Sequence, residues 1–171
     1  MDEFGARPIF LVGFMGSGKT EVGTRLAARL GWDFADTDRW VETRAGRSVE
    51  RIFAQWGEGR FREWEAEALA VLAPRRRVVI ATGGGLFTCH AHRATIRAHG
   101  VSVWLDVPLE GVRRRIGESA GRPLWRSDDA VALRAFFDRR RATYALADLR
   151  VDADSADATE VAARVLAAVS R

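Results

Sequence analysis

The sequence predicts a parallel three-layer α/β sandwich, in which helices cover both faces of one sheet. First, apolar runs typical of buried strands alternate with helical stretches along the chain, without an internal repeat. Second, the first apolar run, residues 8–12, leads into a glycine-rich loop and then an amphipathic segment, residues 21–30. Third, 171 residues with 47% hydrophobic and 29% charged positions suit a single domain, 1–171, with a sizeable core.

The glycine-rich loop, GFMGSGKT at residues 13–20, matches the pattern of a phosphate-binding P-loop. Its glycines allow the backbone to wrap closely, so that N–H groups and the following helix N-terminus can cradle a polyphosphate. Lys19 would then reach the outer phosphates, and the Thr20 hydroxyl would bind Mg²⁺. The residues expected to bind the nucleotide in this loop are Gly16, Ser17, Gly18, Lys19, Thr20 and Glu21. The alternative, a glycine turn that merely starts a helix, is disfavoured by the complete motif and its flanks.

The positions of the basic residues support a phosphate-binding loop at Lys19 and do not support a nucleic-acid-binding surface. Lys19 is the only lysine, whereas the other basic residues are all arginine, and a compact ammonium suits this position better than a planar guanidinium. The net charge is +4, but the arginine runs at 75–77, 113–115 and 139–141 are far apart in the sequence. They also lack the interleaved aromatic or glycine residues of an RNA-binding sheet, so no nucleic-acid partner is expected.

Composition also predicts the compartment. Residues 1–7 contain no apolar core of a secretion signal, and no apolar run approaches the roughly 18 residues of a membrane span. The single cysteine, Cys89, excludes an internal disulfide and fits a reducing compartment. Cys89, His90 and His92 are close in sequence but have no second ligand pair, so no zinc site is expected. We expect a cytoplasmic monomer without a membrane partner.

Carboxylates follow two of the apolar runs. Residues 32–38 are predicted to form a short strand that ends in Asp36 and Asp38, whose side chains would face the same side and act together. Asp106 follows another apolar run and is a second candidate for Mg²⁺. We rank it below Asp36 because Val107 and Pro108 look like the start of a helix.

The middle of the chain carries an arginine on a helix and a triple glycine. Ser48 is predicted to cap a helix, and residues 58–72 form a longer helical pattern in which Glu65 lies one turn beyond Arg62. Residues 77–82 read as a strand that Gly83, Gly84 and Gly85 end, leaving backbone N–H groups open to a ligand or, alternatively, forming a flexible turn. The other expected elements are helices at 90–98, 109–116, 130–147 and 156–169 and strands at 101–105 and 149–152, with a mobile lid at about 117–129.

Seven motifs occur in a fixed order: GFMGSGKT, ADTD, SVERIF, GE followed by FREWE, TGGG, RPL at 122–124, and Arg140 four residues before Tyr144. Together they resemble the shikimate kinase family over nearly the whole chain. The resemblance implies a P-loop fold of the nucleoside monophosphate kinase type, with a five-stranded parallel sheet and a substrate-binding region at about 36–65. It also implies transfer of the γ-phosphoryl of ATP to the 3-hydroxyl of shikimate, with Mg²⁺ as cofactor.

The resemblance assigns roles on the acceptor side. Asp38 would hydrogen-bond the substrate hydroxyls, and Arg62 and Arg140 would hold the carboxylate. Gly84 and Gly85 would offer backbone N–H groups, and Gly83 belongs to the same substrate site. These roles fit the chemistry of a small anion with three hydroxyls, which needs a bidentate cation and a carboxylate acceptor. Asp38 is also the natural group to accept the hydroxyl proton.

The resemblance also assigns roles on the nucleotide side. Asp36 would hold Mg²⁺ through water, Arg122 would fold down with the lid onto the phosphates, and Arg114 would lie against adenine. Phosphoryl transfer depends on aligning the hydroxyl and neutralising charge, here with Mg²⁺, Lys19 and Arg122. The segment between Arg114 and Arg122 is about one residue longer than the family pattern, which leaves the register of the adenine contact open.

Two other functions compete with this interpretation. A kinase of the same fold acting on gluconate or a nucleotide would keep the P-loop, but a nucleotide acceptor would need a base-reading pocket. A non-catalytic ATP-binding module is disfavoured because every expected catalytic group is present. These groups are Lys19, Thr20, Asp36, Asp38 and Arg122.

Overall fold

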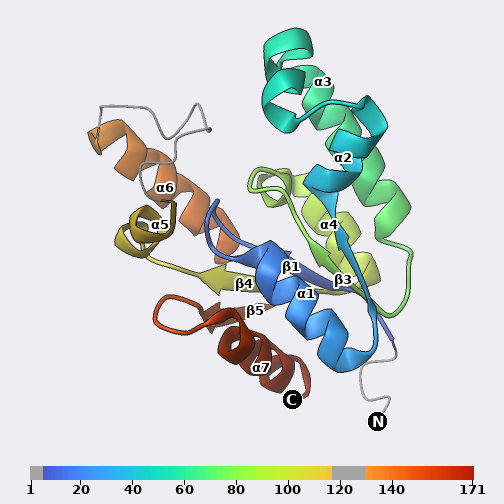
Figure 1. The fold of residues 1–171 in the computed structure, drawn as a ribbon, viewed down its shortest axis with the longest axis vertical. Helices are drawn as coiled ribbons and strands as arrows, with labels where there is room; N and C mark the ends of the chain where they lie inside the picture. The colour runs from blue at the N-terminus through green and yellow to red at the C-terminus, as the bar shows by residue number, and fades with distance from the viewer. Residues whose placement is uncertain (1–5, 117–129) are drawn as a thin grey trace.

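The computed structural model describes residues 6–116 and 130–171, which form a five-stranded parallel sheet flanked by helices (Figure 1). The strand order is β2-β3-β1-β4-β5. The strands are β1 (Ile9–Val12), β2 (Asp33–Asp36), β3 (Val78–Ala81), β4 (Val101–Asp106) and β5 (Leu149–Asp152). The predicted α/β class with a five-stranded parallel sheet is confirmed.

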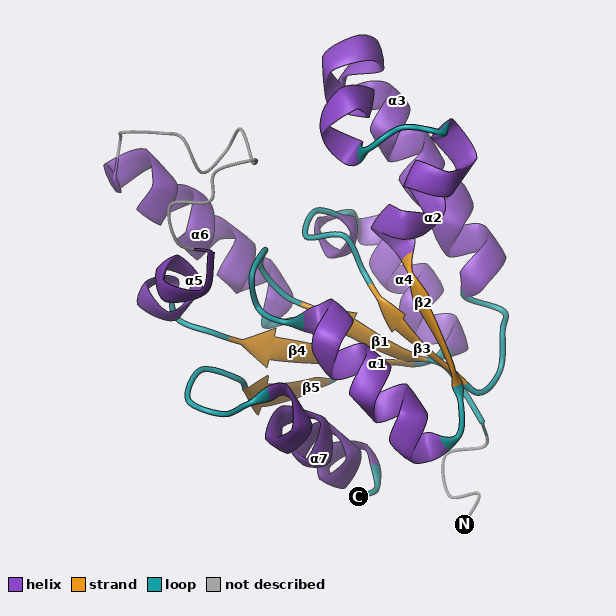
Figure 2. Cartoon of the chain, in the orientation of Figure 1, coloured by secondary structure: helices purple, strands orange, loops and turns teal. Residues whose placement is uncertain are grey.

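The centre of the sheet forms the core. Every residue of β1 and β3 is buried, and Ile9 lies between Val79 of β3 and Val101 of β4. Strands covered on both faces read as continuous apolar runs, which is why they are visible in the sequence. Helices α1 (Lys19–Leu30) and α7 (Ala158–Val169) lie side by side on one face, and α4 (His90–His99) lies behind the sheet (Figure 2).

The strand order predicts a ligand site beyond the carboxyl end of β1. After β3, the chain crosses from one side of β1 to β4 on the other side. Ligands in open α/β sheets bind where the strand order reverses, outside the carboxyl ends of the strands. The P-loop leaves β1 at this point and leads into α1, so the fold directs the loop toward that site.

Two helices with a small core of their own follow β2. Helix α2 (Thr37–Ala45) was not predicted, and it is capped by Asp36, whose carboxylate accepts hydrogen bonds from the Asp38 and Arg39 N–H groups. The expectation that residues 32–38 form one strand is therefore wrong, because the strand ends at the capping residue. Helix α3 (Val49–Leu72) begins after its predicted cap, Ser48. The second core comprises Val41, Ile52, Phe61, Trp64 and Ala68.

The other helices agree with the sequence to within a few residues. A short 3₁₀ turn, η1 (Leu86–Thr88), precedes α4, and α5 (Leu109–Ile116) has the predicted bounds. Helix α6 (Ala130–Tyr144) ends at Tyr144 instead of residue 147. Helix α7 begins at Ala158 because Asp157 caps it, and the hydrogen bonds from Glu160 and Thr159 N–H groups lower the pKa of that carboxyl.

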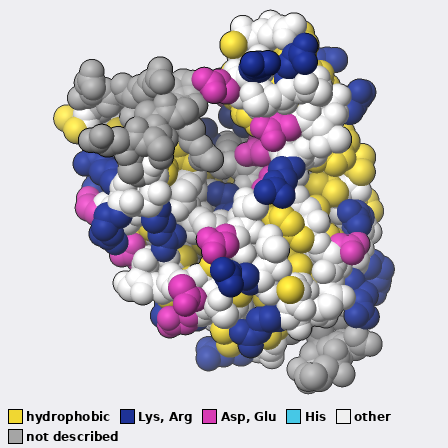
Figure 3. Space-filling view, viewed as in Figure 1, with side chains coloured by type: hydrophobic (Ala, Val, Ile, Leu, Met, Phe, Trp, Pro, Cys, Tyr) yellow, Lys and Arg dark blue, Asp and Glu magenta, His cyan; other side chains and the backbone are white. Residues whose placement is uncertain are grey.

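The surface charges are mixed. Arginine and acidic side chains are interspersed on the face that Figure 3 shows, without a continuous basic stripe on that face. Among the residues that the structure describes, no helix has the length and apolar character that crossing a membrane requires.

Candidate active site

The P-loop wraps around the ammonium group of Lys19. Its Nζ donates to the carbonyl oxygens of Gly13 at 2.7 Å and Phe14 at 2.9 Å, and it lies 3.4 Å from the Ser17 hydroxyl. The wrap requires positive φ angles at glycine, including 73° at Gly16, where a Cβ would lie 2.8 Å from the Ile116 side chain. A cation and a helix N-terminus are thus combined in one loop, an arrangement suited to phosphate.

Thr20 and Asp36 meet at the foot of this loop. The Thr20 hydroxyl donates to Asp36 Oδ2 at 2.8 Å, although the two residues belong to α1 and the end of β2. Mg²⁺ in kinases is held by one or two protein oxygens together with substrate phosphates, so this pair fits the donor set. Within residues 6–116 and 130–171, no group of three or more His, Cys, Asp or Glu forms an alternative metal site. Glu21, the next residue, is exposed and pairs with Arg25 at 3.0 Å.

Two carboxylates approach Gly83 on the acceptor side. A Cβ at Gly83 would lie 2.5 Å from Asp38 Oδ1 and 2.8 Å from Glu65 Oε1, so only glycine leaves room for both. The Gly83 N–H donates to the Thr37 hydroxyl at 2.8 Å, which leaves that N–H engaged within the fold. Asp38 lies in the first turn of α2 and reaches the site from there, not from the end of a strand.

Arg62 lies between a buried and an exposed glutamate on α3. Its Nη1 donates to Glu65 Oε2 at 2.8 Å and its Nη2 to Glu58 Oε1 at 2.9 Å. Glu65 is 1% exposed and Glu58 65% exposed, so only the Glu65 pair is shielded from water. Burial opposes the charge on Arg62, but the hydrogen bonds and charges of both glutamates outweigh it and raise the Arg62 pKa. The guanidinium occupies the space that a side chain at Gly85 would need.

Arg140 reaches the same glycine loop from α6. Its Nη1 lies 3.3 Å from both the Gly84 carbonyl oxygen and the Thr88 hydroxyl, and its guanidinium stacks over Phe136 at 5.0 Å from the ring centre. The Tyr144 hydroxyl donates to the same Gly84 carbonyl at 2.5 Å. The structure therefore brings Asp38, Arg62, Gly83–Gly85 and Arg140 around one loop.

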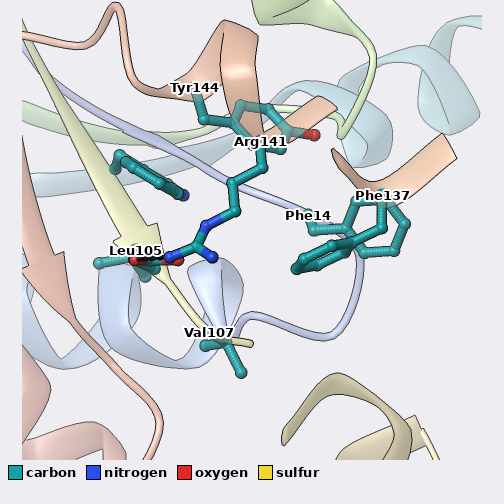
Figure 4. Close-up of a pocket in the computed structure, with 8 residues that line it drawn as sticks. Phe14, Leu105, Val107, Phe137, Arg141 and Tyr144 are labelled. Atoms are coloured by element: carbon teal, nitrogen blue, oxygen red, sulfur yellow. Dashed lines mark hydrogen bonds and ion pairs between the residues drawn. The ribbon is translucent and has the colours of Figure 1, made fainter. Parts of the chain in front are cut away.

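Asp106, the lower-ranked candidate for Mg²⁺, forms ion pairs with two arginines. Its carboxylate is buried, and Oδ2 pairs with Arg141 at 2.8 Å and Arg150 at 2.6 Å. Both guanidinium groups also lie over the Trp104 ring, at 5.6 and 5.1 Å from its centre. Figure 4 shows Arg141 extending from α6 to the carboxylate beside Leu105. The group thus joins β4, β5 and α6.

We expect Asp106→Asn to lower the free energy of unfolding by about 2 kcal/mol while leaving kcat within about twofold, because two partly exposed arginines lose a buried partner. Urea unfolding and steady-state kinetics measure the two effects. Asp33→Asn is the control, since its pair with Arg75 is exposed and its loss should change stability by less than about 0.5 kcal/mol. A large loss of kcat with unchanged stability would indicate instead that Asp106 takes part in binding Mg²⁺.

Among the described residues, Arg115 donates a hydrogen bond to the P-loop backbone, a role that the sequence did not single out for it. It donates to the carbonyls of Ser17 at 3.2 Å, Asp154 at 2.9 Å and Ala153, and so joins the P-loop to the turn after β5. Arg114, the predicted adenine contact, pairs with Asp154 at 2.9 Å and is largely exposed. Periodicity along 113–115 gave no way to decide which arginine turns inward. Arg122, Trp125 and the lid at 117–129 lie outside the described residues.

Comparison with known proteins identifies the family. The family model for shikimate kinase matches residues 15–170. The shikimate kinase of Moorella thermoacetica is 45% identical over 157 residues, covering 92% of this chain and 91% of that protein. The shikimate kinase of Synechococcus elongatus is 42% identical over 154 residues, covering 90% and 80%.

Solved structures agree. The shikimate kinase of Aquifex aeolicus superposes with a TM-score of 0.86 at 35% identity, covering 95% of each chain. The Acinetobacter baumannii enzyme, solved in complex with shikimate, gives 0.87 at 34% identity, covering 94% of this chain and 90% of that one. A gluconokinase from Sinorhizobium meliloti, 18% identical with a TM-score of 0.61, shares the fold alone. With its P-loop, the residues gathered around Gly83–Gly85 and a family-model match over residues 15–170, the chain belongs to the shikimate kinase family.

Proposed function

We propose that this chain transfers the γ-phosphoryl group of ATP to the 3-hydroxyl of shikimate, giving shikimate 3-phosphate and ADP. The observation that carries the proposal is the meeting of two loops at Gly84. A Cβ on Gly84 would lie 3.8 Å from Met15 N and 3.9 Å from Gly13 O of the P-loop. The glycine loop around which the proposed acceptor residues gather therefore lies against the loop that would hold phosphate, as in-line transfer requires.

On the nucleotide side, Lys19 exchanges its loop carbonyls for the outer phosphate oxygens of ATP. Thr20 and Asp36 are the residues that would hold Mg²⁺. When bound, Mg²⁺ neutralises charge on the phosphate oxygens. Arg122, which lies outside the described residues, would add its positive charge to the transferred group, as the family resemblance implies. Arg114 would lie against adenine, and Arg115 would hold the P-loop through the Ser17 carbonyl.

On the acceptor side, Arg62 and Arg140 bind the shikimate carboxylate through charge-assisted hydrogen bonds. Asp38 accepts a hydrogen bond from the 3-hydroxyl and takes its proton as the oxygen attacks the γ-phosphorus. The new bond joins that oxygen to phosphorus, and the bond from phosphorus to the bridging oxygen of ADP breaks. Glu65 holds Arg62 from beneath, so the exposed Glu58 can be displaced by the substrate carboxylate without loss of the buried pair.

Two observations support shikimate as the acceptor. The Acinetobacter baumannii relative was solved with shikimate bound, and its fold covers almost all of this chain. The presence of two arginines and the Asp38 carboxylate around one loop suits a compact hydroxylated acid, whereas the likeness to a gluconokinase extends to the fold alone. We further propose that the chain is a single-domain cytoplasmic protein that acts as a monomer, without nucleic-acid or membrane partners. Gel filtration of the pure protein can test whether it is a monomer.

The proposal is tested by a coupled assay of ADP release with Mg²⁺ and ATP, comparing shikimate, quinate, gluconate and AMP at matched concentrations. We expect turnover with shikimate at least about 100-fold above the others, because quinate and gluconate share its carboxylate but not the ring geometry that would align its 3-hydroxyl, and AMP has no carboxylate. Turnover with gluconate or AMP instead would keep the P-loop argument and reject the acceptor site. Binding of ATP without turnover of any acceptor would favour a non-catalytic module.

A further inference from the structure

The carbonyl oxygen of Gly84 is the point at which three parts of the chain meet. It belongs to the loop between β3 and η1, it accepts hydrogen bonds from Tyr144 and Arg140 of α6, and its residue faces the P-loop backbone. The bond from Tyr144 Oη is 2.5 Å long, whereas that from Arg140 Nη1 is 3.3 Å. The tyrosine therefore makes the shorter and stronger of the two contacts.

Tyr144 is built to hold this one contact. Its side chain is 2% exposed, and its ring packs near Trp104 with 6.4 Å between ring centres. Burial raises the pKa of the Tyr144 hydroxyl above its usual range, although the nearby Arg140 opposes the shift, so the group remains an O–H donor. Figure 4 shows the hydroxyl pointing away from the Arg141–Asp106 pair. Tyr144 therefore attaches α6 to the glycine loop, whereas Arg141 attaches α6 to Asp106 of β4.

Arg140 depends on the same carbonyl for its position. It lies four residues before Tyr144, so both side chains leave the same face of α6. Among the described residues, it also contacts the Thr88 hydroxyl at 3.3 Å and the ring of Phe136. A shift of the Gly84 carbonyl would therefore move the longer Arg140 bond, and with it the direction of the guanidinium.

We propose that Tyr144 is a positioning residue of the acceptor site, whose hydroxyl fixes the Gly84 carbonyl and thereby sets where Arg140 meets the shikimate carboxylate. The inference rests on the proposed function, in which Arg140 binds that carboxylate. If Tyr144 acts in this way, loss of its hydroxyl should affect shikimate and not ATP. A tyrosine that merely stabilised the fold would affect both substrates or neither.

The test is Tyr144→Phe, which keeps the ring and removes the hydroxyl. We expect the KM for shikimate to rise about fivefold, as for the loss of one hydrogen bond, while the KM for ATP stays within about twofold. In an Arg140→Ala background, Tyr144→Phe should change the shikimate KM by less than about twofold, since the group it positions is gone. Thermal unfolding of each variant shows that the comparison is made on folded protein.

Ser102→Ala is the matched control. Ser102 is also buried, at 3% exposure, and its hydroxyl donates to Asp148 at 2.6 Å near the start of β4, at the opposite end of the strands from the site. It should lower the Tm without changing either KM. Equal KM changes for both substrates in Tyr144→Phe, no change, or full additivity with Arg140→Ala would overturn the role of Tyr144 alone. Absence of shikimate turnover by the unmodified enzyme would overturn the proposed function and this inference with it.

Discussion

Lys19→Met is expected to lower kcat/KM for shikimate phosphorylation by about 10³-fold, because the transferred phosphoryl group loses a preorganised cation. The fold should survive. The ammonium group donates to two P-loop carbonyls, so the unfolding free energy should fall by only about 1 kcal/mol. Steady-state kinetics and urea unfolding measure the two effects separately.

Lys19→Arg is the informative comparison for this variant. It keeps the positive charge, but the planar guanidinium cannot occupy the space between the Gly13 and Phe14 carbonyls that the compact ammonium fills. We expect nearly the same loss of activity as in Lys19→Met. Activity close to that of the unmodified enzyme would mean that charge alone suffices.

Because the chain has no other lysine, amine-directed labelling also reports on this residue and the N-terminus alone, and ATP should protect Lys19.

Arg62→Ala is expected to raise the KM for shikimate about 100-fold, equivalent to about 2.7 kcal/mol, with little change in the KM for ATP. It should also lower the unfolding free energy by about 2 kcal/mol, because Glu65 is left buried without its counter-ion. The stability estimate lies below that for a fully buried pair, since Arg62 remains one-third exposed.

A double substitution separates the two consequences. Replacing Arg62 with methionine and Glu65 with leucine together removes the buried charge along with its partner, so stability should recover while the shikimate KM stays high. Arg60→Ala is the matched control, because Arg60 and Glu63 have the same spacing on α3 but are both exposed. It should change stability by less than about 0.5 kcal/mol and neither KM. Equal effects of Arg62→Ala on both substrates would remove Arg62 from the acceptor site.

The features that the sequence alone determined are those encoded in contiguous residues. The P-loop, the buried strands and the cap at Ser48 depend on neighbours within a few positions, so the local pattern carries them. The boundary after β2 was missed for a related reason. Asp36 ends the strand because it caps α2, and the alternation of residues 32–38 hid that role.

Only the tertiary structure decided which of the residues singled out in the sequence contact one another. Thr20 bonds Asp36, Gly83 admits Asp38 and Glu65, and Tyr144 reaches Gly84 across 60 positions. It also turned Asp106 toward two arginines and placed Arg115, not Arg114, on the P-loop. These choices follow from how parallel strands bring distant carboxyl ends to one edge, and from which side chains then find space and a partner there. Such competition between distant groups is not encoded in the local sequence, because the partners that decide it lie far away along the chain.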